Sequence, residues 1–126
     1  MNTTTGQALT ATLRKSFRIN SRTRDYRDGG SIKRDMLDSI RNAVVYPGYY
    51  GAERTELSRA AWGTLAAYDK HVEGFRIAGE LRFQIVSMSP YAFAALIGRM
   101  VDAGVTNCGE GERFFNNMTR ELHAAA

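Results

Sequence analysis

The chain has 126 residues, 44% of them hydrophobic and 24% charged, and it carries a formal net charge of +4 with one cysteine and two prolines. This composition predicts one globular domain over residues 1–126 with a packed core, and it excludes a disordered or fibrous chain and an internal disulfide. The longest apolar run, YAFAALIG, is far shorter than the ~20 residues that span a bilayer, and the first residues lack a secretory signal, so we expect a cytoplasmic protein without membrane contact.

The first expected element is a short helix over residues 4–17. Leu9, Leu13 and Phe17 recur at intervals of four residues, which places them on one face of a helix. From Phe17 onward the pattern alternates, and the paired glycines at 29–30 end it. We therefore expect residues 17–27 to form either an additional strand with an arginine-lined face or a mobile arm.

Two helices and a tyrosine-rich turn are expected next. One helix begins at Ser31 and ends at the Pro47-Gly48 pair, and the other covers about residues 53–70, because apolar residues repeat with helical spacing in both segments. The sequence YPGYYG between them places three tyrosines in one turn: Tyr46, Tyr49 and Tyr50.

Residues 75–86 have the clearest strand pattern in the chain. Apolar side chains and one glycine occupy every odd position from Phe75 to Ile85, and the even positions are mostly polar or charged. The pattern predicts either one strand kinked at Gly79 or a hairpin that turns at residues 78–80.

The last two expected helices complete the fold class. Ser89 is a suitable N-cap, Pro90 suits the first helical position, and Gly104 suits the residue that follows a helix. The final helix is expected over about residues 110–123. Taken together, these elements predict an α+β fold of about five helices with a small antiparallel sheet.

The residues that carry out most catalysis are scarce in this sequence. The chain has two histidines, His71 and His123, and one thiol at Cys108, and no spacing typical of a zinc or calcium site. Cys108 is the best candidate nucleophile, because a helix N-terminus would favour its thiolate and His71 could act as a base. No group is evident that would orient the histidine, so we expect no enzyme, no cofactor and no metal.

Positive charge is concentrated in residues 14–27, which we call the basic segment. It contains six basic residues and one acidic residue, whereas the rest of the chain contains 11 basic and 12 acidic residues. Arginines bind phosphate and carboxylate groups, and tyrosines give rigid contact area. The residues expected to bind a partner are therefore Arg14, Lys15, Arg18, Arg22, Arg24, Tyr26, Arg27, Tyr46, Tyr49 and Tyr50.

Two kinds of partner are compatible with this surface. We expect a non-catalytic binding protein that docks on a protein or nucleoprotein, for example as an inhibitor or adaptor of phage or mobile-element type. Direct, weakly sequence-specific nucleic-acid binding through residues 14–27 is the alternative, although so local a patch gives modest affinity. An enzyme is the third interpretation of the function. For the arginines alone, the alternative to binding is a solvated surface, since nearby aspartates can neutralise them. The oligomeric state is not defined by the sequence.

Overall fold

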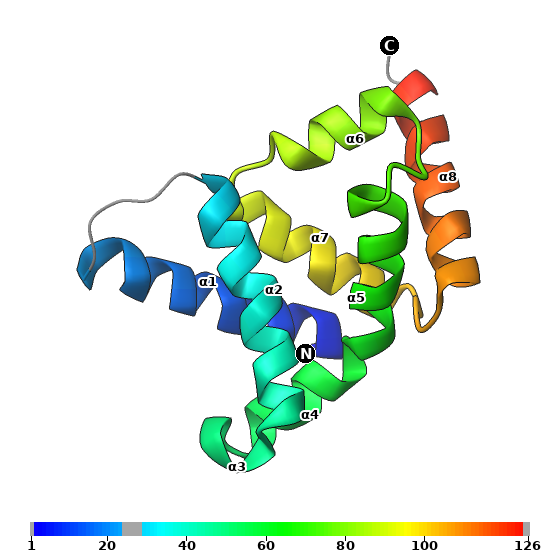
Figure 1. The fold of residues 1–126 in the computed structure, drawn as a ribbon. Coiled ribbons are helices and arrows are strands. Elements are labelled where there is room, and N and C mark those ends of the chain that lie inside the picture. Colours follow the sequence, from blue (N-terminus) through cyan, green and yellow to red (C-terminus); the bar gives the residue numbers. More distant parts are fainter. Residues whose placement is uncertain (1, 24–28, 125–126) are drawn as a thin grey trace.

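Throughout the described part of the computed structural model, all regular secondary structure is helical (Figure 1). The structure describes residues 2–23 and 29–124, and the side chains of residues 2–18 and 32–124. No strand occurs in these ranges, so the expected α+β class with a small antiparallel sheet is wrong, and the described chain is all-α.

The helices follow one another with short connections. Their bounds are α1 (Thr5–Thr23), α2 (Gly29–Val45), α3 (Pro47–Tyr50), α4 (Ala52–Ala60), α5 (Trp62–Tyr68), α6 (Gly79–Val86), α7 (Pro90–Asp102) and α8 (Cys108–Ala124), and a π-helical turn at Asp69–Glu73 extends α5. Helix α1 packs chiefly against α7, α2 against α4, and α5 against α8. In Figure 1, α3 and α4 form the lower end of the molecule and α6 lies at the opposite end.

The strand or arm expected at residues 17–27 is replaced by helix as far as Thr23. Residues 24–27 lie outside the described residues. Helix α1 begins with a capping box, in which the Gln7 amide donates to Thr4 Oγ1 and the Thr4 amide donates to Gln7 Oε1. Phe17 packs against the core one turn beyond Leu13, so the apolar face continues past the point where the alternating pattern begins.

The strand or hairpin expected at residues 75–86 is also wrong, because Gly79–Val86 forms α6. Leu81 and Ile85 are fully buried, whereas Phe83 between them is 71% exposed. Two buried residues four positions apart match one helix face as well as they match one strand face. A strand also needs a partner ladder, and no strand lies beside this segment in the described chain.

The helix expected over residues 53–70 is divided. Helix α4 ends at Ala60, α5 begins at Trp62, and the backbone of Ala61 between them has φ −90° and ψ −3°. The Ala61 amide still donates to the Leu57 carbonyl at 3.2 Å, so this helical hydrogen bond is kept at the turn.

The helix expected after Ser89 is confirmed with both of its ends. Ser89 Oγ accepts a hydrogen bond from the Ala92 amide at 3.1 Å, and Pro90 is the first helical residue. Gly104 follows the helix with a φ of +77°, a conformation that favours glycine.

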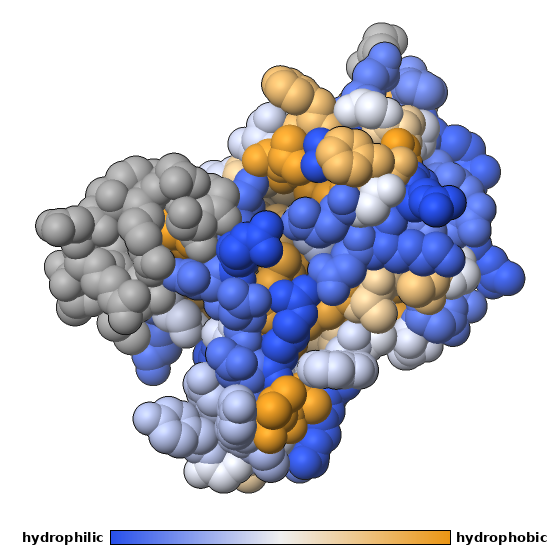
Figure 2. Space-filling view, viewed as in Figure 1, coloured by the Kyte–Doolittle hydropathy of each residue, from blue (hydrophilic) through white to orange (hydrophobic). Residues whose placement is uncertain are grey.

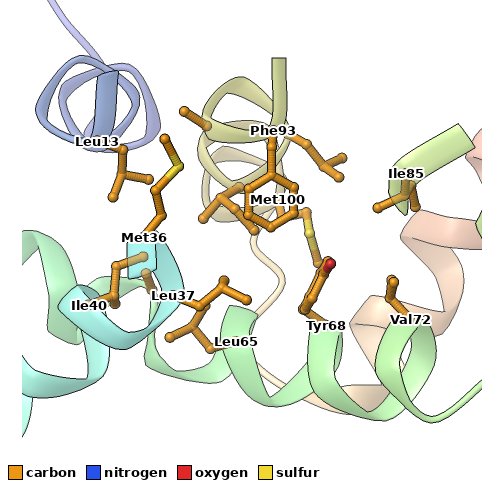
Figure 3. Close-up of a cluster of buried hydrophobic side chains, with 14 of the residues drawn as sticks. Leu13, Met36, Leu37, Ile40, Leu65, Tyr68, Val72, Ile85, Phe93 and Met100 are labelled. Carbon is orange, nitrogen blue, oxygen red and sulfur yellow. The ribbon is translucent and has the colours of Figure 1, made fainter. Parts of the chain in front are cut away.

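Buried side chains from α1, α2, α5, α6 and α7 meet in one core (Figure 3). The ring of Tyr68 stands edge-on to that of Phe93, with centroids 5.4 Å apart. Leu13 and Ile40 are fully buried, and burial of each such side chain contributes about 1.5–3 kcal/mol. Because α1 supplies Leu13 to this core, the first half of the basic segment is part of a packed helix and not of an arm.

The crossing of α1 and α7 fixes the position of the basic segment. A Cβ atom added to Gly98 would lie 2.4 Å from the Gly6 carbonyl oxygen and 2.0 Å from Thr10 Oγ1, so the two backbones are in direct contact. Asp102 at the end of α7 accepts hydrogen bonds from the Thr4 hydroxyl at 2.5 Å and the Gly6 amide at 2.8 Å. These contacts hold the first turns of α1 against α7.

Candidate functional site

A cleft of about 630 Å³ opens between α1 and the corner where α3 meets α4. We call it the corner cleft; it is lined by Thr12, Lys15, Ser16, Tyr50, Gly51, Ala52, Glu53, Arg54 and Leu57. Lys15 comes from the basic segment and Tyr50 from the tyrosine-rich turn. The fold therefore brings together the two features that the sequence analysis selected separately.

Arg54 is the partly buried cation of this cleft. Its Nη2 donates to Ser39 Oγ at 2.8 Å and its Nη1 to Ser16 Oγ at 3.4 Å, and the Tyr50 ring lies 5.9 Å from its guanidinium carbon. The Ser39 hydroxyl itself donates to the Met36 carbonyl at 2.8 Å, which turns its lone pairs toward Arg54. Arg54 is thus held by two serines from different helices.

No carboxylate among the described side chains forms an ion pair with Arg54. Burial lowers the pKa of the Arg54 guanidinium, and the nearby Tyr50 raises it in part. An arginine stays protonated in a protein despite such a shift. The corner cleft therefore contains a positive charge that described acidic groups do not neutralise by direct contact.

The geometry of the α3–α4 corner depends on Gly51. This residue has φ +87° and ψ 157°, a region that only glycine occupies readily. Thr55 holds the corner from the next turn, because its hydroxyl lies 2.8 Å from the Gly51 carbonyl oxygen and 3.1 Å from that of Pro47. No side chain caps α4 at Gly51.

The remaining residues expected to bind a partner are dispersed. Arg14 points to the other side of α1, where its Nε donates to the Tyr91 carbonyl at 3.1 Å and its guanidinium lies 3.6 Å above the Tyr91 ring. Arg14 thus joins α1 to α7. Arg18 is exposed and already interacts with another residue. Residues Arg24, Tyr26 and Arg27 lie outside the described residues, as does the side chain of Arg22.

The other two tyrosines of the turn are at the surface. Tyr49 is 85% exposed and Tyr46 62% exposed, and the Tyr49 ring lies 5.6 Å from that of Tyr50. Both continue the corner surface beyond the cleft, and their role as partner-binding residues stays a prediction.

Sequence reasoning missed Arg54, the central cation of the cleft. Arg54 precedes Leu57, a partly buried member of the apolar face of α4, by three positions, and this spacing places both on the same side of a helix. A charged residue at such a position was the available signal. The serine partners on α1 and α2 could not be assigned, because they are distant in sequence.

The arrangement at Cys108 differs from a nucleophile–base pair. Cys108 was expected just ahead of the last helix and is instead the first residue of α8, and His71 Nε2 lies 2.8 Å from the Cys108 carbonyl oxygen. A carbonyl only accepts, so Nε2 carries the proton and this contact joins the π-helical turn to α8. His71 Nδ1 is buried and has no hydrogen-bond partner among the described residues. Among the described residues, no group of three or more potential metal ligands lies close together.

A second surface exposes apolar side chains around α6 (Figure 2). Phe75 is 70% exposed and has a φ of +57°, an unusual conformation for a bulky residue. The Arg82 guanidinium lies 3.6 Å above the Phe75 ring, and Arg82 Nε donates to the Val72 carbonyl at 2.9 Å. These contacts hold Phe75 in place at the end of the π-helical turn.

Comparison of the chain with protein-family models, curated proteins and solved structures found no match in any of the three. Within the described residues, no helix combines the length and the apolar character that crossing a membrane requires. The site must therefore be interpreted from its own geometry.

Proposed function

We propose that this chain is a non-catalytic binding protein that docks on a protein or nucleoprotein partner, as an inhibitor or adaptor, through the surface around the corner cleft. The observation that carries this proposal is the meeting of Lys15 and Tyr50 around Arg54. A partly buried arginine without a described carboxylate partner favours an external anionic group. Tyrosines beside such a cation are typical of protein interfaces.

The charge pattern supports a contact surface of limited extent. Lys15 and Arg54 line the cleft, whereas Arg14 of the same basic segment is occupied by Tyr91. Arg14 is therefore not available to the ligand that Lys15 and Arg54 would bind. Non-specific binding to nucleic acid weakens with each phosphate contact that is lost in this way. A structured partner that combines an acidic or phosphate group with contact area for Tyr49 fits this surface better than naked duplex.

Site-specific cross-linking tests the proposal. A photoreactive amino acid in place of the exposed Tyr49 should cross-link to the partner in an extract of the producing cells, and excess unmodified protein should compete. The matched control carries the same group at Arg113 on α8, whose side chain is 80% exposed. The double variant Lys15→Gln and Arg54→Gln should reduce the Tyr49 product by at least about tenfold.

The result separates the alternatives. A product that contains protein supports docking, and one that contains only nuclease-sensitive nucleic acid supports the direct nucleic-acid alternative. Equal labelling at Tyr49 and Arg113, or no competition by unmodified protein, would show that this surface has no specific partner.

A further inference from the structure

The corner cleft is much larger than a single anion requires. Its volume of about 630 Å³ lies within the usual range for small-molecule sites, which is about 300–1,000 Å³. Its lining combines the cations of Lys15 and Arg54 and the hydroxyl group of Ser16 with Tyr50, whose ring lies 5.9 Å from the Arg54 guanidinium carbon. The cleft therefore offers polar groups and an aromatic ring to one ligand.

The polar groups of the corner cleft suit a phosphate group. A guanidinium has five N–H donors in a planar fork. Among the described side chains, only Ser16 and Ser39 accept hydrogen bonds from Arg54, one from Nη1 and one from Nη2. The remaining donors have no acceptor among the described residues. The two serines fix the orientation of the guanidinium, so less entropy is lost when it pairs with phosphate oxygens.

The aromatic ring of the corner cleft suits a base. Tyr50 lines the cleft, and Tyr49 lies beside it with its ring tilted by 59° to that of Tyr50. Stacking of a base on an aromatic side chain contributes to binding without requiring a particular sequence. A phosphoserine or phosphothreonine side chain would leave this aromatic surface without a planar partner.

We infer that the corner cleft binds one nucleotide, with its phosphate on Arg54 and Lys15 and its base on Tyr50. The inference rests on the proposed function, because it names the class of ligand that the same binding surface takes. A nucleotide within an exposed single strand and a free nucleotide present the same chemistry to the cleft.

Glu53 opposes the binding of an anion. It is the acidic residue that lines the corner cleft, and it is exposed in the first turn of α4. Its charge partly offsets those of Lys15 and Arg54, so Glu53→Gln should strengthen binding of any phosphate group there. An increase in affinity for this variant distinguishes a specific site from a general loss of structure, because a loss of structure would only weaken binding.

Amide NMR titration at constant ionic strength provides the test. Adenosine 5′-monophosphate should shift the Gly51 amide saturably with a dissociation constant of about 1 mM or below, and the remote Gly109 amide on α8 should not move. Adenosine, which lacks the phosphate, should bind at least about tenfold more weakly. Inorganic phosphate should shift Gly51 in the same direction with lower affinity.

Matched variants assign the contacts. Arg54→Gln and Lys15→Gln should each weaken nucleotide binding by at least about fivefold, whereas Glu53→Gln should strengthen it by about twofold. Arg59→Gln, on the same helix but outside the lining of the corner cleft, should change nothing. Lys15 is exposed, so its variant keeps the test valid if Arg54→Gln unfolds.

Each outcome decides a separate question. Equal binding of adenosine and its monophosphate, or equal effects of the Arg54 and Arg59 variants, overturns the inference. A short single-stranded oligonucleotide that binds at least about tenfold more tightly than the mononucleotide identifies the strand as the source; weaker binding identifies the free nucleotide. If nucleotide binding fails while Tyr49 still cross-links specifically, only this inference is wrong; if nucleotide binds without any cross-link, only docking is wrong.

Discussion

Tyr68 is a buried phenol at the junction between α5 and the π-helical turn. Its side chain is 4% exposed and contacts the edge of Phe93 (Figure 3). Burial raises the pKa of Tyr68 above its usual value of 10.0, and the carboxylates of Glu73 and Asp69 raise it further. Ionisation of this side chain therefore opposes folding.

The sign of the resulting pH dependence follows directly. Above pH 10.0 the unfolded chain loses the Tyr68 proton while the folded chain retains it, so the stabilisation is complete below this pH and is lost as pH rises. We expect the free energy of unfolding to fall by about 1.4 kcal/mol per pH unit above 10 because of this group. Urea unfolding of the wild type and of Tyr68→Phe at a series of pH values below and above 10 measures this slope.

Lys33 must be considered in the same experiment. Burial lowers the pKa of Lys33 from its usual value of 10.5, so its contribution to stability rises with pH up to that value. The two groups change the free energy of unfolding in opposite directions around different pH values. In the Tyr68→Phe variant, the fall of this free energy above pH 10 should therefore disappear, and its rise below pH 10 should remain. Parallel curves for the two proteins would contradict the assignment to Tyr68.

The same lysine joins α2 to the end of α6. Lys33 is 8% exposed, and its Nζ donates to the carbonyl oxygens of Val86 at 2.6 Å and Met88 at 2.9 Å. These carbonyls belong to the end of α6 and to the residues that follow it, where helical partners are missing. A lysine from α2 thus completes the hydrogen bonding of a helix that is distant in sequence.

Replacement of this lysine tests that role. Lys33→Met keeps an unbranched side chain but leaves two carbonyl groups without their donor, and we expect a loss of about 1–3 kcal/mol in the free energy of unfolding. Lys70→Met, at an exposed position, is the matched control and should change stability by less than about 0.5 kcal/mol. Urea unfolding at neutral pH gives both values; equal effects would mean that the two hydrogen bonds contribute little.

At the scale of whole elements, the contact between α1 and α7 is the tightest helix crossing described here. A methyl group on Gly98 would overlap the Gly6 carbonyl oxygen, which belongs to the backbone and cannot rotate away. Gly98→Ala should therefore lower the free energy of unfolding by about 1–3 kcal/mol. Gly79→Ala is the control, because no atom lies within 4 Å of a Cβ added there. A thermal unfolding series distinguishes them, and equal melting temperatures would contradict the close crossing.

Helices with local signals at their ends could be predicted from the sequence. The helix after Ser89 was predicted because Ser89, Pro90 and Gly104 each act within a few residues of its ends. Helix α6 could not be predicted in this way. Its N-cap residue, Ala78, provides no side-chain cap, and the hydrogen bonding at its C-terminal end is completed by Lys33 from another helix. The spacing of Leu81 and Ile85 is compatible with both structures, so the choice depended on contacts that the local sequence does not contain.

For the whole molecule, the candidate site was predictable in part. Lys15 and Tyr50 were selected for charge and aromatic character, and both line the corner cleft. Arg14 met the same criterion and instead joins α1 to α7 through Tyr91. Composition identifies which side chains can bind a partner, but the helices packed around α1 decide which of them share one site. The contact between Arg14 and Tyr91 joins residues that are distant in sequence, so the local sequence does not contain it.

The hydrogen bonds from Thr4 and Gly6 to Asp102 also affect the order in which the chain can fold during synthesis. The ribosome produces α1 well before α7, so the N-terminal helix emerges without the surface that covers Leu9 and Leu13. Until the last turn of α7 leaves the exit tunnel, this apolar face remains accessible to chaperones. The moment at which α1 is committed to its final position therefore depends on when residue 102 leaves the exit tunnel.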